Sequence, residues 1–488
     1  MISRSRKHRP CSGETHHSAR LYTECVADFH IENFGCRAAR ADGEAVSAQL
    51  RAAGHSLQGP FEAEVVVVNT CSVTAEADRA ARAFIRRTHR RNPQARIVVT
   101  GCYAQRAPQE LAALPGVAAV VGNSHKALAP EVVRGLMEPG TLPTAELVQI
   151  TPAASATAHL YVNDLFTHSF LEEAQVQPGV QTRPNLKIQE GCGNRCSFCV
   201  IPATRGPSRS LPPAAVLRQV EGFVAGGGNE LVLSGINLGR WGRDLADDNG
   251  WSLARMVRAI LAQTALPRLR LSSIEPMDWD AELIAVLQEH GGARMARHAH
   301  LPLQSGSDAV LRRMHRRYRP WHYADKVQAL LRAAGPALTL GADVMVGFPG
   351  ETDVEFEETV ALLRQLPFGY LHLFPFSPRP GTRGEALHAA APVAPQVVDE
   401  RIAALRALAF EKSSAHRRSF LGQTMPALTL HTSVALSARN RTAALTENFL
   451  PVELEGAHAA NRLVAVRAID LTPGGNLHAA ALQPAFAY

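Results

Sequence analysis

The feature that most constrains the fold is a regular alternation of strand-like and helix-like segments between residues 184 and about 385. Short apolar runs between turn residues are typical of buried parallel strands, and longer amphipathic stretches are typical of helices. Strands are expected at 186–189, 230–233, 269–272, 299–303, 340–346 and 370–374. Helices are expected near 213–225, 252–263, 279–290, 307–315, 322–334 and 353–365. This pattern predicts a partial (β/α)6 barrel over residues 184–412, with its chemistry at the C-terminal ends of the strands.

Smaller regions lie on both sides of the barrel in the sequence. The whole chain is expected to belong to the α/β fold class. Residues 28–130 hold a weak strand near 27–34 and two β-branched runs, 65–71 and 96–102, around a helical pattern at 76–91. They predict an open α/β domain. Residues 131–183 are rich in Ala, Thr and Pro, and we expect a linker with a lid or edge segment. Residues 413–488 predict a small all-β barrel, with strands near 427–430, 449–454 and 462–466. Residues 1–27 are expected to be a disordered extension.

Composition narrows the class of protein. The 488 residues are 46% hydrophobic and 19% charged, which excludes wholesale disorder. The formal net charge of +7 permits a polyanionic partner. No apolar run reaches the length of a transmembrane helix, so we expect no membrane association and a cytoplasmic location. Thiols are kept reduced there, which favours metal ligation over disulfides.

The cysteines are crowded into the first part of the chain. They are Cys11, Cys25, Cys36, Cys71, Cys102, Cys192, Cys196 and Cys199. The last three have the spacing C-x3-C-x2-C and follow the first expected barrel strand. Three thiolates can hold three irons of a [4Fe–4S] cluster and leave the fourth iron open for a ligand. The alternatives are an incomplete zinc site or a chance pattern. Cys11 and Cys25 are expected to be free thiols.

The loop from Cys192 to Cys199, with aromatic Phe198 before its last cysteine, resembles the radical S-adenosylmethionine (SAM) superfamily. The resemblance implies that SAM binds the open iron and is cleaved there after a one-electron transfer. It also implies SAM contacts from residues at the ends of the following strands. The candidate cofactor-binding residues are Phe198, Gly235, Asn237, Ser273, Glu275 and Gln304.

Cys36, Cys71 and Cys102 are far apart in sequence, but each directly follows an expected strand. Ligands bind beyond the carboxyl ends of strands in open parallel sheets, so the three thiols are expected to form a second three-cysteine site. The alternative is three unrelated buried cysteines. The stretches 33–36, 66–74 and 98–105 resemble the methylthiotransferases, a radical SAM subfamily. This resemblance implies two [4Fe–4S] clusters and a C-terminal TRAM-like barrel.

Three stretches, 200–210, 235–244 and 312–318, resemble the branch of that family that acts on N6-threonylcarbamoyladenosine beside the tRNA anticodon. The resemblance implies that a methylthio group is added to carbon 2 of the adenine with two SAM molecules. It also implies a sulfur donor and an electron donor such as flavodoxin or ferredoxin. The alternatives are isopentenyladenosine in tRNA, a ribosomal-protein aspartate, and a non-catalytic metal-cluster protein that binds RNA.

Arginine is concentrated in two segments, 79–91 and 312–319. The second also holds Tyr318, and aromatic residues among basic ones suit stacking and phosphate contact with RNA. The alternative is an ordinary solvated helix face. The candidate RNA-binding residues are Arg316, Arg317 and Arg319.

Overall fold

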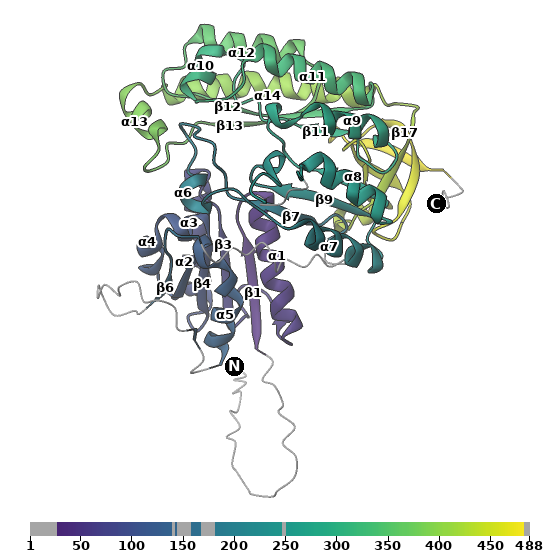
Figure 1. Ribbon diagram of the computed structural model, residues 1–488. Coiled ribbons are helices and arrows are strands. Elements are labelled where there is room, and N and C mark those ends of the chain that lie inside the picture. The colour runs from purple at the N-terminus through teal and green to yellow at the C-terminus, as the bar shows by residue number, and fades with distance from the viewer. Residues whose placement is uncertain (1–26, 139–141, 144–157, 167–180, 246–249, 483–488) are drawn as a thin grey trace, which may run out of the picture.

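The computed structural model describes residues 27–138, 142–143, 158–166, 181–245 and 250–482. It contains an N-terminal α/β sheet, a central partial barrel and a closed C-terminal β-barrel (Figure 1). The expected α/β fold class is therefore confirmed. The extension expected at 1–27 lies outside the described residues except for Ala27.

The N-terminal sheet is fully parallel, with the strand order β2-β1-β3-β4-β5-β6. Its strands are β1 (Asp28–Asn33), β2 (Ser56–Leu57), β3 (Val65–Thr70), β4 (Arg96–Gly101), β5 (Val117–Gly122) and β6 (His159–Tyr161). Its helices are α1 (Arg37–Ala52), α2 (Ala75–Arg91), α3 (Cys102–Arg106), α4 (Pro108–Ala112), the 3-10 helix η1 (Asn123–Leu128) and α5 (Ala129–Met137).

Alternate residues of β3 and β4 point to opposite faces of this sheet, and each face has its own core. Val65, Val67 and Val98 pack with α1 and α5, whereas Val66 and Val99 pack with α2 and α4. Burial on both faces explains why these strands are continuous runs of valine and isoleucine.

Part of the expected linker belongs to the N-terminal domain. Residues 131–137 continue α5, and β6 (His159–Tyr161) adds a parallel edge strand beside β5. The boundary expected at residue 130 therefore falls inside a helix. The amphipathic run Val132-Val133 and Leu136 closes the core over α1 and explains why the helix continues.

The central domain has the expected β/α alternation. Its parallel strands are β7 (Asn185–Glu190), β9 (Glu230–Gly235), β10 (Arg268–Leu271), β11 (His298–His300), β12 (Thr339–Val346) and β13 (Phe368–Pro375). The short strand β8 (Arg209–Ser210) pairs antiparallel with β7. The helices are α6 (Ile201–Arg205), α7 (Pro213–Ala225), η2 (Leu238–Arg240), α8 (Leu253–Gln263), η3 (Pro276–Asp278), α9 (Ala281–His290), α10 (Asp308–Arg313), α11 (Pro320–Ala334), α12 (Asp353–Gln365), α13 (Arg383–Ala390) and α14 (Pro395–Arg418).

The barrel is open between its first and last parallel strands. Its strands form two sheets, β10-β9-β7-β8 and β11-β12-β13, which a single bridge between Leu269 and Met295 helps to join. Helix α1 of the N-terminal domain lies beside β7 (Figure 1), and the side chain of Asp42 on α1 forms an ion pair with Lys187 on β7. The N-terminal domain therefore packs against the open side of the barrel.

The C-terminal barrel closes in the order β14-β15-β16-β18-β17. Its elements are β14 (Thr424–Thr429), α15 (Val434–Ser437), β15 (Arg441–Thr446), β16 (Pro451–Glu455), β17 (Leu463–Leu471) and β18 (Leu477–Ala481). Helix α14 runs past the boundary expected at residue 412. The loop after β15 reaches the central domain, where Glu447 pairs with Arg297 and Asn448 donates to the Ala337 carbonyl. This small barrel thus lies at the N-terminal ends of the central strands.

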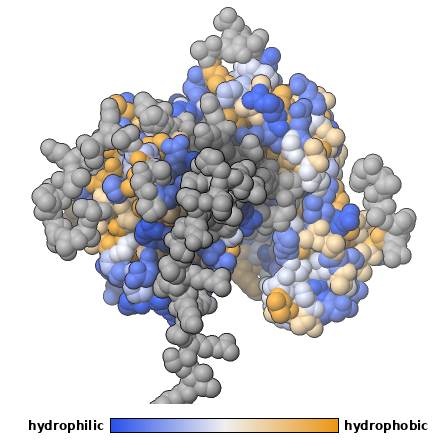
Figure 2. Space-filling view, turned by 90° about the horizontal axis from the view of Figure 1, so that it is seen from below, coloured by the Kyte–Doolittle hydropathy of each residue, from blue (hydrophilic) through white to orange (hydrophobic). Residues whose placement is uncertain are grey.

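No helix in the part of the chain that the structure describes combines the length and the apolar character needed to cross a bilayer. The face seen from below mixes hydrophilic and hydrophobic residues among those that are coloured (Figure 2).

Candidate active site

The first cysteine triad comes from three loops at one edge of the N-terminal sheet. Cys36 lies between β1 and α1, Cys71 follows β3, and Cys102 begins α3 directly after β4. Because β1, β3 and β4 are parallel neighbours, their ends meet at the same edge. Gly35 has a φ of 105°, and a Cβ there would lie 2.1 Å from the Cβ of Cys71. The structure therefore brings these cysteines together, and glycine is what lets the first loop approach the second.

The thiols of this triad interact with one another and with polar neighbours. The pKa of Cys36 is lowered to about 5 because the Cys71 thiol donates a hydrogen bond to it, and the charge of Arg205 adds to this effect. The same hydrogen bond, together with burial, raises the pKa of Cys71. Arg205 Nε donates to Cys102 Sγ at 3.1 Å, and Asn123 Nδ2 lies 3.5 Å from that sulfur. Cationic and N–H groups of this kind stabilise thiolates.

A buried ionic network joins the two domains behind Cys102. Lys126 Nζ lies 2.5 Å from Asp42 Oδ2, and Arg205 Nη1 lies 2.5 Å from Glu190 Oε1. Lys187 pairs with both carboxylates. Burial alone would raise the pKa of Asp42, but Lys126, Lys187 and Arg205 hold it below its usual range. With three cations against two carboxylates, a surplus of positive charge lies beside the cysteine triad.

Replacement of Arg205 by glutamine is expected to lower the free energy of unfolding by about 3–5 kcal/mol, because it leaves buried carboxylates short of a partner. Chemical denaturation measures this loss. The change also removes the N–H···S hydrogen bond to Cys102, so the spectrum of a cluster in this triad is expected to shift. That spectrum is best recorded in a chain that lacks the other three cysteines. Lys126→Met, which weakens the same network without a bond to sulfur, is expected to lower stability only. Identical cluster spectra for Arg205→Gln and the parent chain would contradict this role.

The second triad lies in the loop that leaves the C-terminal end of β7. Asn237 Nδ2 lies 3.5 Å from Cys192 Sγ, and Arg316 Nη1 lies 3.3 Å from Cys196 Sγ. Burial raises the pKa of Cys192 and raises that of Cys199 to about 12. These thiols therefore need a bound metal centre to be thiolates at neutral pH.

The spacing of both triads argues against a single metal ion. Tetrahedral zinc with Zn–S bonds of about 2.3 Å needs sulfurs roughly 3.8 Å apart. Among the described residues, His300, Asp343 and His372 form a group with ligand atoms within 4.8 Å of one another, whereas neither cysteine triad does. An iron–sulfur cluster is larger than one ion, and three cysteines leave one of its irons open. The donor set fits such a cluster.

Three candidate cofactor residues end or follow strands of the central barrel, as the second triad does. Buried Asn237 Oδ1 and Gln304 Oε1 have no hydrogen-bond partner within the described residues, which fits a polar ligand that is bound there. Gln304 also has a φ of 64°, a strained conformation for this residue type. Gly235 ends β9, and a Cβ there would lie 2.9 Å from Gln189 Oε1.

Three other candidate cofactor residues are less directly placed. Phe198 packs edge-on against Phe348, with ring centroids 6.5 Å apart. Ser273 is exposed. Glu275 forms an ion pair with Arg316 instead of lying free for a ligand.

The candidate RNA-binding arginines differ in what they contact. Arg316 is only 7% exposed and is held by Glu275 and Cys196, so the expectation that it reaches RNA is corrected. Arg319 pairs with Asp308 at 3.1 Å and donates to two nearby carbonyls, which makes it a structural residue of its loop. Arg317 is exposed and lines a pocket beside the second triad.

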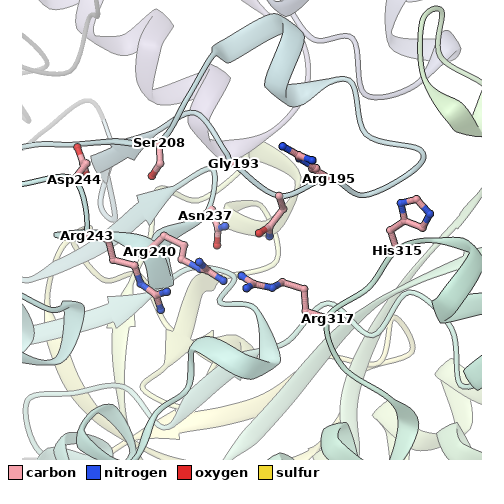
Figure 3. A pocket seen from close by; sticks show the side chains of 10 residues that line it. Gly193, Arg195, Ser208, Asn237, Arg240, Arg243, Asp244, His315 and Arg317 are labelled. Carbon is pink, nitrogen blue, oxygen red and sulfur yellow. The ribbon is translucent and has the colours of Figure 1, made fainter.

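That pocket has a volume of about 570 Å³ and is strongly basic. Its cationic side chains are Arg195, Arg240, Arg243 and Arg317, with His315 at its edge. In Figure 3, Arg240 and Arg317 point toward one another across the pocket. The carboxylate of Asp244 in the pocket is already bound by Ser210, while Asp278 holds Arg240 and Arg243 from behind. The arginine side of the pocket therefore favours an anionic group.

Two family models match the chain. Residues 28–122 match "Uncharacterized protein family UPF0004", and residues 186–363 match "Radical SAM superfamily". A threonylcarbamoyladenosine tRNA methylthiotransferase MtaB from Bacillus subtilis is 34% identical over 434 residues, which cover 88% of this chain and 91% of the relative. The protein of the same name from Aquifex aeolicus is 33% identical, with 89% and 98% covered. A tRNA-2-methylthio-N(6)-dimethylallyladenosine synthase from Geobacter metallireducens is 34% identical, with 73% and 77% covered.

Fold, site and matches together define a radical SAM enzyme that uses an iron–sulfur cluster and SAM. More particularly, the chain belongs to the radical SAM methylthiotransferase family.

Proposed function

We propose that this enzyme adds a methylthio group to carbon 2 of N6-threonylcarbamoyladenosine beside the anticodon of tRNA. It uses two [4Fe–4S] clusters, two SAM molecules, a sulfur donor and a reduced electron donor such as flavodoxin or ferredoxin. The observation that carries the proposal is the pair of three-cysteine sites on the two sides of one domain interface, with Arg205 joining them. Arg205 is the last residue of α6, six residues after Cys199, and its Nε donates to Cys102 of the other triad.

In this proposal the clusters, when bound, supply one-electron cleavage of SAM and a site for the transferred sulfur. Cys192, Cys196 and Cys199 hold one cluster, and Asn237 and Gln304 orient SAM with their free amide oxygens. Cys36, Cys71 and Cys102 hold the other cluster. Arg205 and Asn123 orient Cys102 and offset its negative charge. The polypeptide therefore positions the reactants and excludes water, while the chemistry belongs to the cofactors.

The choice of threonylcarbamoyladenosine over an isopentenyl-type base rests on two supports. The B. subtilis and A. aeolicus relatives bear the name of the former activity, although the G. metallireducens relative bears that of the latter. The inner face of β11, β12 and β13 is also polar, with His300, Asp343 and His372 in mutual contact. A threonylcarbamoyl group offers hydrogen-bonding atoms to this polar face, whereas a dimethylallyl group offers none.

The basic pocket supports an RNA contact through Arg317. Replacement of Arg317 by glutamine is expected to weaken RNA binding and to reduce the slope of log affinity against log salt by about 1, because one phosphate contact is lost. Titration of an anticodon stem-loop at several salt concentrations measures both. Arg312→Gln is the matched control, because Arg312 lies on the same segment but pairs with Asp308 at 2.8 Å outside the pocket. An unchanged slope in Arg317→Gln, or an equal change in the control, would remove this residue from the interface.

The whole proposal is tested in cells by mass spectrometry of tRNA nucleosides. A strain that lacks the gene is expected to lose the methylthio form of threonylcarbamoyladenosine and to keep the unmodified base. Loss of methylthio-isopentenyladenosine, or of a methylthio group on a ribosomal protein, would assign the other substrates. A separate assay for 5′-deoxyadenosine excludes a non-catalytic RNA-binding protein if the product forms.

A further inference from the structure

A cluster of polar side chains lies on β11, β12 and β13. Tyr370 Oη lies 2.8 Å from His298 Nε2 and 2.9 Å from His300 Nδ1. Asp343 Oδ1 lies 3.1 Å from His300 Nε2 and 3.2 Å from His372 Nδ1. These contacts make one connected chain from buried His298 to His372, whose side chain is 57% exposed. The His372 end of this hydrogen-bonded series is therefore open to solvent.

The aromatic ring of Phe449 packs against this cluster. It comes from the C-terminal barrel, and its centroid lies 4.4 Å from that of His298 and 5.5 Å from that of Tyr370. The guanidinium carbon of Arg270 lies 5.3 Å from the same ring, and that of Arg37 lies 5.9 Å away. Arg37 thus reaches from α1 into a space bounded by two other domains.

Arg37 differs from the other arginines around this ring. Arg183 and Arg270 are both held by the buried carboxylate of Glu230. Arg37 is exposed and makes no hydrogen bond or ion pair within the residues that the structure describes. Its guanidinium therefore remains a free cation with a planar fork of donors.

The covalent position of Arg37 ties this cation to the chemistry. It directly follows Cys36 and is the first residue of α1, so its side chain and the helix N-terminus both favour negative charge there. Asp343 lies close enough to act electrostatically on Arg37, but His300 and His372 already bind that carboxylate. Arg37 is thus available to pair with an additional anion.

We propose that Arg37 binds the carboxylate of the threonylcarbamoyl group and thereby selects the substrate. This inference rests on the proposed function and names a specificity residue for it. A guanidinium binds a carboxylate through two parallel hydrogen bonds, which fixes the position of the base as well as adding affinity. The Tyr370–His300–Asp343–His372 chain offers partners for the hydroxyl and amide groups of the same substituent. A dimethylallyl group leaves Arg37 without a partner.

The test compares three anticodon stem-loops that carry threonylcarbamoyladenosine, its carboxyl methyl ester or dimethylallyladenosine. With the parent enzyme, kcat/KM for the free acid is expected to exceed that for the ester by about tenfold to a hundredfold, the value of a charged hydrogen-bonded pair. Arg37→Gln is expected to lose that preference, because kcat/KM falls for the free-acid RNA only. Arg37→Lys is expected to restore part of the preference. Binding of the three RNAs gives a second readout that does not depend on turnover.

Arg40→Gln is the matched control, because Arg40 is exposed one turn further along α1. Iron content is measured for each variant so that cluster loss beside Cys36 is recognised. Equal rates of the parent enzyme on acid and ester would overturn the inference without any variant. An equal fall of kcat/KM for the free-acid RNA and the ester RNA in Arg37→Gln would overturn it as well. Turnover of dimethylallyladenosine RNA by the parent enzyme with none of the threonylcarbamoyladenosine RNA would instead overturn the proposed function itself.

Discussion

A chain with Cys192, Cys196 and Cys199 replaced by alanine is expected to form no 5′-deoxyadenosine from SAM under reducing, anaerobic conditions. The triad lies at the C-terminal end of β7. Asn237 and Gln304, whose amide oxygens have no partner among the described residues, follow β9 and β11. Without the thiolates, the iron content is expected to fall by about one cluster. Methylthio transfer is expected to be lost completely. Chromatography of the reaction products and an iron assay measure these outcomes.

The matched control is a chain in which Cys11 and Cys25 are replaced by alanine. These cysteines belong to neither triad, so iron content and 5′-deoxyadenosine formation are expected to stay at the parent level. A Cys192/Cys196/Cys199 variant that retains both clusters would show that the ligands are misassigned. One that still cleaves SAM would contradict the role of this loop.

Replacement of Cys36, Cys71 and Cys102 by alanine is expected to separate the two halves of the reaction. SAM cleavage to 5′-deoxyadenosine is expected to continue, because the barrel loop is intact. Transfer of the methylthio group is expected to be abolished, because the site beside Arg205 no longer holds a cluster. The iron content is again expected to fall by about one cluster. Nucleoside mass spectrometry and 5′-deoxyadenosine quantification on the same reaction distinguish the two activities.

The two triple variants form a reciprocal pair. If the first-triad variant still transfers the methylthio group at the parent rate, the N-terminal site has no part in sulfur chemistry. If it loses no iron, the three dispersed cysteines are ordinary buried residues. Circular dichroism of each variant verifies that the domain which holds Cys71 and Cys102, both buried, is still folded.

The sequence allowed the barrel and both triads to be predicted because these features depend on local patterns. Continuous β-branched runs such as 65–68 and 97–99 form strands that are buried on both faces. Once the strands are placed, the cysteine that follows each one is placed at the same edge of the sheet. The strands β15 and β18 were not expected, because their sequences, RTAALT and LHAAA, are rich in alanine. Alanine has low β propensity, and only closure of the barrel supplies their partners.

The contacts of individual arginines depend on the tertiary fold. Arg316 lies in a basic stretch that suggests an RNA contact, but its partners Glu275 and Cys196 lie 41 and 120 residues away. Arg205 was not expected to belong to the site, and the sulfur that it contacts lies 103 residues away. The signal that could have found this network is a pair of charged residues, Lys187 and Glu190, on an otherwise buried strand. Such charges need buried partners. Those partners are distant in the sequence, so a local pattern does not identify them.

The central claim is methylthio transfer to threonylcarbamoyladenosine, and one reaction tests it most directly. Reconstituted protein is incubated anaerobically with SAM, a reductant, sulfide and an anticodon stem-loop that carries this base, and the nucleosides are weighed by mass spectrometry. The predicted result is a nucleoside in which a methylthio group replaces one hydrogen, formed together with 5′-deoxyadenosine and absent with the Cys192/Cys196/Cys199 variant. An unchanged nucleoside in a reaction that produces 5′-deoxyadenosine would contradict the proposed substrate.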